Sequence, residues 1–278
     1  MADIDIALDG KQAALAARYG AAVPKAGPWN DTIALMHRHR SVRGYRPDPP
    51  PPGTLETLVA AAQSAATSSN LQTWSVVAIA DAGRKARLAR IAGGQKHIEQ
   101  CPLFLAWIAD LSRLERVGRA AGRSLEGLPY LEMFMIALVD AALAAQNAVT
   151  AAESLGLSTV YIGALRNDPE AVARELALPP MAMACFGLCV GYATPQATGE
   201  VKPRLPQAAV LHHEQYRPDG EPALHAAYDA TLTQFSRRHE MAQASWSERV
   251  IARLGKVGGL MGRDRMRTAL QALGWELR

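Results

Sequence analysis

The residues from 130 to 155, YLEMFMIALVDAALAAQNAVTAAESL, place the strongest limit on what this chain can fold into. Apolar residues, many of them alanine, occupy almost every position, so the segment favours one long helix that is apolar on nearly all of its faces. Such a helix has to be buried on nearly all faces, either in a core or against a second subunit. Its longest apolar run, from Met133 to Ala145, is broken by Asp140 and is too short to span a membrane.

Strand and helix patterns alternate along most of the remaining chain. Apolar runs bounded by turn residues predict strands over 74–80, 104–110, 158–163 and 183–193. Helical patterns cover residues 31 to about 40, where Asn30 or Asp31 can cap the helix, and residues 54–66 and 81–92. Another helix begins at Asp168-Pro169. Residues 1–30 favour either a short helix packed on the main body or a loose extension. We therefore predict one α+β domain over residues 31–278, with a core sheet and helices on both faces.

Composition limits the classes of function that this chain can have. Its net charge of +4 is too small to argue for nucleic-acid binding by itself. From Arg237 to Arg278 nine Lys/Arg face four Asp/Glu, but few aromatic residues lie between these cations. Three cysteines indicate no disulfide framework, and the first 25 residues do not resemble a secretory signal. We expect a cytoplasmic protein that binds neither nucleic acid nor a membrane.

Several familiar motifs are incomplete in this sequence. GRAAGRS at 118–124 lacks the glycine spacing and the lysine of a phosphate loop, and no GxSxG elbow occurs. Cys185 and Cys189 lie on a predicted strand, which suits a core better than zinc. His37 and His39 stand beside arginines, a poor environment for a metal cation. The sequence therefore predicts no metal site and no hydrolytic nucleophile.

Positive charge gathers in the segment HRHRSVRGYRPDPPPP, residues 37–52, where four arginines fall within nine residues. Arg40 and Arg43 are three apart, so at a helix end they would share a face with Ser41 between them. The four prolines that follow forbid any continuation of a helix. This cluster is either a solvated helix end or an anion site.

A second cationic segment, KPRLP, covers residues 202–206. A residue before proline is extended, so Lys202 and Arg204 would point the same way, roughly 7 Å apart. The ammonium of Lys202 is a point charge and the guanidinium of Arg204 is a planar group with several donors, and this pair suits a phosphate. Taken alone, a segment of this kind is more often a solvated loop.

HRSVR, the TSSNLQ loop, GGQKH, YIGALRN, FGLCVGY and KPRLP together carry a resemblance to a known family. Their order and spacing resemble the FMN-dependent nitroreductases, in particular the branch of the oxygen-insensitive NADPH nitroreductases and NADPH-flavin oxidoreductases. The resemblance covers residues 31 to 278. It implies an α+β fold with a central mixed, mainly antiparallel sheet flanked by helices, and a long buried helix at a homodimer interface.

The resemblance also implies which residues contact FMN. His39, Arg40, Ser41, Lys202 and Arg204 would contact the phosphate and ribityl chain, and Arg43 the pyrimidine edge. The remaining implied contacts are Thr67, Ser69, Gln95, Tyr161, Ile162, Gly163 and Ala164. Ala164 replaces a family glycine; the methyl group is penalised if that position needs a positive φ, and otherwise it only trims the pocket.

The implied reaction is a ping-pong transfer of two electrons. NAD(P)H gives a hydride to flavin N5 and leaves, and an electron-poor nitroaromatic, quinone or free flavin then accepts the electrons. No protein side chain is expected to act as a general acid or base, because the flavin supplies the chemistry. The alternative is a flavin-binding module that senses redox state or docks a partner with little turnover.

Preference for NADPH over NADH would come from arginines in the C-terminal third. Arg237 matches one family arginine that meets the 2′-phosphate, whereas a second falls on Ala242, and Arg238 is the candidate substitute. An ordinary solvated helix surface explains the same charges. The sequence does not name the physiological acceptor.

Overall fold

The computed structural model describes residues 2–197 and 199–278, which divide into two compact units. The first unit joins the residues up to Arg40 with Glu200–Leu260, and the second joins Ser41–Gly199 with Met261–Arg278. The chain therefore passes from the first unit to the second at the peptide bond between Arg40 and Ser41.

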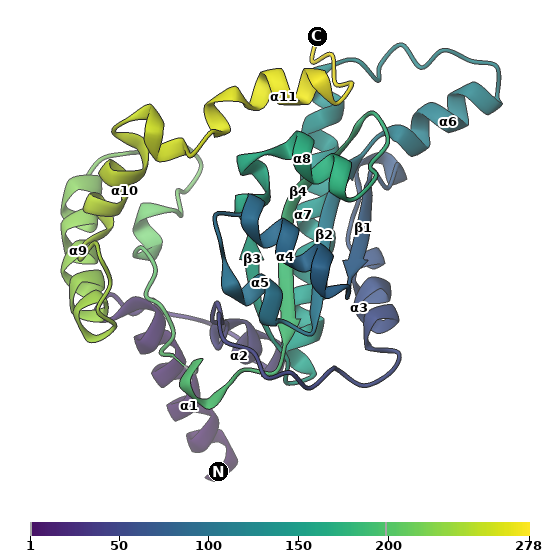
Figure 1. Cartoon of the computed structure of the whole chain (residues 1–278). Coiled ribbons are helices and arrows are strands. Elements are labelled where there is room, and N and C mark those ends of the chain that lie inside the picture. Colours follow the sequence, from purple (N-terminus) through teal and green to yellow (C-terminus); the bar gives the residue numbers. More distant parts are fainter. Residues whose placement is uncertain (1, 198) are drawn as a thin grey trace. The chain divides into compact units, whose positions relative to one another are not determined.

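The second unit is built on a four-stranded sheet (Figure 1). Its strands are β1 (Trp74–Ile79), β2 (Leu103–Asp110), β3 (Ser158–Ile162) and β4 (Ala182–Gly191). The strand order is β1-β2-β4-β3, and every paired strand is antiparallel. The predicted α+β class with a mainly antiparallel sheet is confirmed, and a parallel element enters as an isolated bridge between Ser41 and Thr159.

Helices cover both faces of this sheet, as the sequence predicts. One face packs against α4 (Ala82–Ile91), α5 (Lys96–Gln100) and α8 (Pro169–Glu175). The other packs against α3 (Thr54–Gln63) and α7 (Leu131–Ser154), and α11 (Met266–Ala272) adds Leu270 to the same cluster. The unit also contains α6 (Ser112–Ala120).

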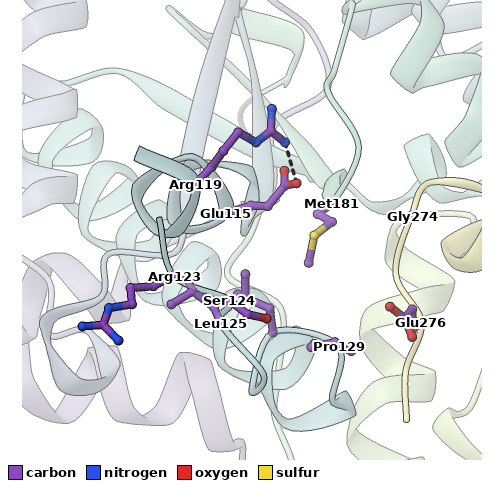
Figure 2. Close-up of a pocket in the computed structure, with 10 residues that line it drawn as sticks. Glu115, Arg119, Arg123, Ser124, Leu125, Pro129, Met181, Gly274 and Glu276 are labelled. Atoms are coloured by element: carbon purple, nitrogen blue, oxygen red, sulfur yellow. Dashed lines mark hydrogen bonds and ion pairs between the residues drawn. The ribbon is translucent and has the colours of Figure 1, made fainter. Parts of the chain in front are cut away.

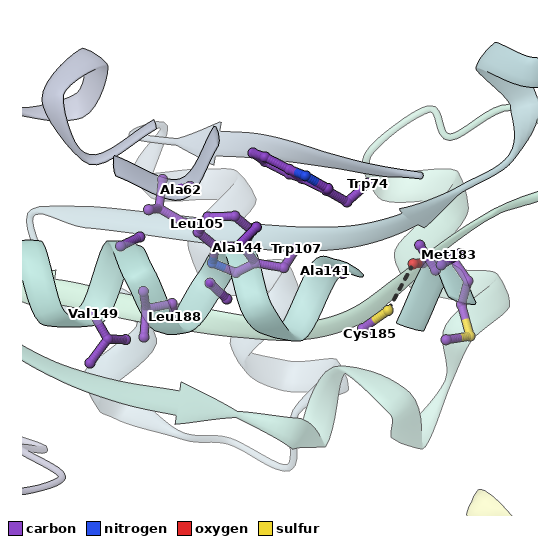
Figure 3. Close-up of a cluster of buried hydrophobic side chains, with 14 of the residues drawn as sticks. Ala62, Trp74, Leu105, Trp107, Ala141, Ala144, Val149, Met183, Cys185 and Leu188 are labelled. Carbon is purple, nitrogen blue, oxygen red and sulfur yellow. Dashed lines mark hydrogen bonds between the residues drawn. The ribbon is translucent and has the colours of Figure 1, made fainter. Parts of the chain in front are cut away.

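Strand β2 lies at the centre and is buried on both faces. Leu105, Trp107 and Ala109 pack into the cluster with α7. Figure 3 shows Leu105 and Trp107 of this cluster together with Trp74 and Ala144. Phe104, Ala106 and Ile108 pack into the opposite cluster with α4. Side chains alternate across a strand, so a continuous apolar run supplies both cores at once.

A glycine on β4 makes room for this packing. A Cβ built on Gly187 would lie 2.3 Å from the Phe104 ring, inside van der Waals contact. The absence of a side chain at Gly187 is therefore what lets the Phe104 ring pack across the neighbouring strand.

The first unit is helical. Its helices are α1 (Ala2–Tyr19), α2 (Asp31–His37), α9 (Glu221–Arg238) and α10 (Trp246–Leu254). Helix α10 begins with a capping box, in which Ser245 accepts from the Glu248 N–H and Glu248 reaches back to the Ser245 N–H. The N-terminal segment thus contains an 18-residue helix, longer than the short helix considered from the sequence.

Helix α7 buries one of its faces and leaves apolar residues on the other. The buried face is formed mostly of alanine, such as Ala141, Ala144 and Ala148. Exposed large apolar side chains on the same helix are Leu131, Met135, Leu138, Val139 and Leu143. By length and composition α7 could cross a membrane, but in the structure it is a partly buried core helix that packs on the sheet.

Asp140 is a buried carboxylate on α7, with 1% of its surface exposed. It accepts hydrogen bonds from the Ser68 N–H at 3.0 Å, the Thr73 N–H at 3.1 Å and the Thr73 hydroxyl at 2.8 Å. One side chain therefore fixes both ends of the loop that leads into β1. Burial of a carboxylate is tolerated where charge-assisted hydrogen bonds satisfy it.

Replacing Asp140 with alanine leaves those three donors without an acceptor. We expect the free energy of unfolding, measured by urea denaturation, to fall by about 2–4 kcal/mol, since an unsatisfied buried donor costs about 1–3 kcal/mol. The matched control is Glu132→Ala, an exposed acid on the same helix, with an expected change within about 0.5 kcal/mol. Equal losses in the two variants would contradict this account of Asp140.

Candidate functional site

The predicted flavin contacts divide between the two units. His39, Arg40, Lys202 and Arg204 belong to the first unit, as do Arg237 and Arg238. Those in the second unit are Ser41, Arg43, Thr67, Ser69, Gln95, Tyr161, Ile162, Gly163 and Ala164.

The first cationic segment follows α2. Asn30 caps this helix by accepting from the Ile33 N–H at 3.0 Å, as the sequence suggests. The helix ends at His37, so the prediction that Arg40 and Arg43 share a helix face is wrong. The prolines from Pro49 onward do not end it either, because it stops well before them. At this end the His37 carbonyl, which a helix end leaves without an intrahelical partner, accepts from the Arg18 guanidinium.

The second cationic segment is anchored by its apolar residues. Pro203 and Pro206 are buried, and Leu205 packs on a small cluster of α9. The Tyr228 hydroxyl donates to the Pro203 carbonyl at 3.0 Å. Arg204, between these prolines, is exposed, and Lys202, just before them, is partly exposed. The Arg204 guanidinium donates to the carbonyls of Lys202 and Pro203, each at 3.2 Å.

The two cationic segments meet at one buried side chain. The guanidinium of Arg18, on α1, donates to the Lys202 carbonyl at 2.8 Å and to the His37 carbonyl at 2.8 Å. Burial, and then the charge of Arg18, lower the pKa of His37. This lowering favours the neutral form of His37, so the arginines are the main source of positive charge in its segment.

In the second unit, the residues after Arg40 run along the edge of the sheet. Ser41 forms its bridge with Thr159, and the Val42 N–H donates to the Thr159 carbonyl at 3.0 Å. The Tyr45 hydroxyl, which is buried, donates to the Val42 carbonyl at 2.8 Å. Ser41 is thereby held beside the strand that carries Tyr161 and Ile162.

Arg43 lies near the GGQKH segment. Burial, and then the charge of Arg43, lower the pKa of His97, which places a guanidinium close to that loop. Gly93 and Gly94 have φ values of +79° and +76°, a left-handed turn that side chains other than glycine rarely adopt. The turn delivers Gln95 to the start of α5, where it occupies the N-cap position.

The loop that contains Thr67 and Ser69 is held in an uncommon conformation. Ser69, Asn70 and Gln72 have φ values of 48°, 54° and 53°, in the left-handed region that residues other than glycine seldom occupy. Such backbone persists only where its surroundings impose it, and it gathers at ligand sites. Asp140 supplies the restraint here.

The YIGA segment turns from strand to helix. β3 ends at Ile162, and the 3₁₀ helix η2 (Gly163–Asn167) follows at once. Ala164 is buried inside this helix and has no positive φ, so the alanine carries no left-handed penalty. The left-handed penalty considered from the sequence therefore does not arise, and the trimming of the pocket by the methyl group stays a prediction. Tyr161 is 36% exposed and packs edge-on against Phe186.

The two candidate NADPH arginines differ in their surroundings. Both occupy the last turn of α9, and both are exposed. Arg238 forms an ion pair with Glu200 at 2.7 Å, an exposed contact worth about 0–1 kcal/mol. A phosphate on Arg238 would have to compete with that carboxylate.

A separate pocket of about 380 Å³ lies between α6, the segment after it and the C-terminal residues (Figure 2). An ion pair between Glu115 and Arg119, 2.7 Å long, lines it together with Met181 and Glu276. It contains none of the predicted flavin contacts, so it is not the predicted site.

Within residues 2–197 and 199–278, no group of three or more His, Cys, Asp or Glu side chains could hold a metal ion. Cys185 and Cys189 are buried in opposite core clusters on the two faces of β4. Burial raises the pKa of the Cys185 thiol to about 12. The structural interpretation of this pair is confirmed.

Sequence reasoning missed two positioning side chains, Arg18 and Asp140. Asp140 does leave a signal, because a lone acid in an otherwise apolar helix requires buried donors nearby. Arg18 leaves none, since its partners are backbone carbonyls up to 184 residues away.

Comparison with known proteins identifies the family of this chain. Residues 36–192 match the nitroreductase family, and residues 202–278 match the C-terminal domain of the nitroreductase family. The chain is 38% identical to the oxygen-insensitive NADPH nitroreductase of Salmonella typhimurium, over 79% of this chain and 89% of that protein. It is 36% identical to an FMN reductase (NADPH) of Bacillus subtilis, over 80% and 90%, and 36% identical to a Cr(VI) reductase of a Pseudomonas species, over 71% and 80%.

Solved structures share the fold. The NfrA1 nitroreductase of B. subtilis superposes with a TM-score of 0.82 at 33% identity, covering 88% of this chain and 99% of that one. The NADPH:FMN oxidoreductase of Vibrio harveyi complexed with NAD⁺ gives 0.79 at 31% identity, covering 90% and 100%. This chain belongs to the nitroreductase family of NAD(P)H-dependent oxidoreductases.

Proposed function

We propose that this protein is an FMN-dependent oxidoreductase that carries two electrons from NADPH to nitroaromatics, quinones or free flavin. The observation that carries the proposal is the meeting of the two cationic segments at Arg18 in the first unit. A phosphate dianion needs several donors at fixed positions, and these segments supply Arg40, Lys202 and Arg204. The names of the relatives, which include NADPH nitroreductases and FMN reductases, support the same reaction.

The residues present fit a phosphorylated flavin. His39, Arg40, Ser41, Lys202 and Arg204 would hold the phosphate and ribityl chain, and Arg43 would direct positive charge to the pyrimidine edge. Thr67, Ser69 and Gln95 would add polar contacts, and the turn from Tyr161 to Ala164 would present backbone N–H groups to the ring. When bound, FMN supplies the electron transfer, so the protein has to bind, orient and shield rather than provide a nucleophile.

The electron donor is proposed to be NADPH, with NADH as the weaker alternative. Arg237 is the proposed contact for the 2′-phosphate, because Arg238 already pairs with Glu200. Nitro compounds and chromate enter as candidate acceptors through the names of two relatives. We further propose that residues 31–278 work as one FMN-binding domain in the cytoplasm.

A homodimer is also proposed. Its support is the exposed apolar side of α7, which includes Met135, Val139 and Leu143 on the helix that carries Asp140. An exposed apolar stripe of this kind on a core helix is typical of an interface between subunits. A second copy of this chain would cover it.

Steady-state kinetics test the proposed reaction. We expect NADPH oxidation to depend on an added nitroaromatic, quinone or flavin, with the parallel double-reciprocal lines of a ping-pong scheme. The same series with NADH measures donor preference. Bound FMN without turnover on any of these acceptors would instead favour a redox-sensing or partner-docking module.

The phosphate contacts are tested by FMN titration. The double variant Lys202→Ala/Arg204→Ala is expected to raise the Kd for FMN at least about 100-fold, since each hydrogen bond to a charged group is worth about 1.5–3 kcal/mol. Arg238→Ala removes a cation of the same unit and is expected to change that Kd less than about threefold. Similar losses in both variants would mean that the phosphate lies elsewhere.

The dimer is tested by analytical ultracentrifugation. The wild type is expected to sediment at twice the chain mass of 29.8 kDa, and Val139→Lys to sediment as a monomer, because a buried unpaired ammonium is costly. The matched control is Val117→Lys, at an exposed valine on α6, which should stay dimeric. A monomeric wild type would overturn the proposal.

A further inference from the structure

The last turn of helix α1 contains an arginine, Arg18, whose burial is unusual. Arg18 has 7% of its surface exposed, although arginine is almost never buried without partners. The helix belongs to residues 1–30, a segment to which the sequence assigns no role. The C-terminal turn of this helix contacts both cationic segments of the first unit.

The planar guanidinium of Arg18 joins those segments through their backbones. One terminal nitrogen donates to the Lys202 carbonyl at 2.8 Å. The other donates to the His37 carbonyl at 2.8 Å and to the His39 carbonyl at 3.2 Å. The three acceptors belong to the two segments that would flank the phosphate.

The backbone of the same residue adds a fourth hydrogen bond. The Arg204 N–H donates to the Arg18 carbonyl at 2.8 Å, so Arg18 holds the second segment at both Lys202 and Arg204. Gly20, just after α1, has φ +59° and approaches α9 closely. A Cβ at Gly20 would lie 2.9 Å from the Thr231 side chain.

We propose that Arg18 is the positioning residue of the phosphate site: it sets the spacing between the His37–Arg40 segment and the Lys202–Arg204 segment. This inference rests on the proposed function. The cationic side chains that would bind phosphate project from irregular backbone, which has no ladder of its own to fix their separation. The N-terminal helix therefore serves cofactor affinity by holding the phosphate ligands in register.

The chemistry of the side chain explains why an arginine occupies this position. A guanidinium presents donors in a rigid plane, so it bridges carbonyls on two sides at once. The ammonium of a lysine is a compact point charge that cannot span both segments with the same geometry. The geometry thus requires the planar guanidinium group and not the positive charge alone.

The test compares FMN with riboflavin, which lacks the phosphate, by fluorescence titration of the full-length apoprotein. Arg18→Lys and Arg18→Met are expected to raise the Kd for FMN about 10–100-fold, since two or more hydrogen bonds to a charged group are lost or weakened. The Kd for riboflavin should rise much less than the Kd for FMN, because riboflavin lacks the phosphate and keeps only the ring and ribityl contacts.

Lys11→Met is the matched control. Lys11 lies on the same helix and also donates to two backbone carbonyls, those of Ala26 and Gly27, at 2.6 and 2.7 Å. Neither carbonyl belongs to a cationic segment, so its Kd for FMN should match the wild type. Thermal unfolding of each variant shows whether it is folded, and Arg18→Lys decides the matter if Arg18→Met does not fold.

Two outcomes would overturn the proposal. In the first, the Arg18 variants bind FMN as tightly as the wild type. In the second, the Arg18 variants show an equal rise in the Kd for FMN and for riboflavin, or Lys11→Met raises the Kd for FMN as much as they do. Either result would mean that Arg18 only stabilises the fold in general. A wild type that binds neither flavin would refute the proposed function instead, so the two failures are distinguishable.

Discussion

A phosphate site requires several cations to stay close to one another although their charges repel. In the proposed phosphate site the first unit would meet that requirement through backbone hydrogen bonds rather than through the cationic side chains themselves. The Arg18 guanidinium links the carbonyls of His37, His39 and Lys202, and its own carbonyl accepts from Arg204. The side chains of Arg40 and Arg204 then project from backbone that is already held.

The second unit contains a comparable arrangement, in which the buried side chain is a carboxylate instead of a guanidinium. Asp140 reaches from the buried face of α7 to the loop before β1 and satisfies donors at both of its ends. The left-handed conformations of Ser69, Asn70 and Gln72 are kept in place by this anchor. In both units, then, one buried charged side chain fixes an irregular segment that carries proposed flavin contacts.

Local pattern was enough to predict most of the fold. Apolar runs marked the four strands, and the residues Asn30 and Asp168 marked helix starts that the structure confirms. The end of α2 was not predictable, because the group that satisfies the carbonyl of its last residue, His37, is Arg18, outside the local sequence. The conformation of Ala164 was likewise undecided, since it depends on how β3 turns into η2.

The site residues were named from ordered motifs, and their identities alone do not reveal what holds them. Ser41 depends on its bridge to Thr159, and Gln95 on two left-handed glycines. These relations are tertiary, so no spacing rule could supply them. The motifs locate the ligands, whereas the positioning residues emerge only from the folded chain.

The central claim is that the protein binds FMN and passes electrons through it. The most direct measurement is the visible absorption spectrum of the FMN-loaded protein under anaerobic conditions, before and after NADPH and then a quinone are added. The account predicts a flavin band that bleaches with NADPH and returns with the quinone. A protein that binds no FMN, or whose flavin band does not change with NADPH, would contradict it.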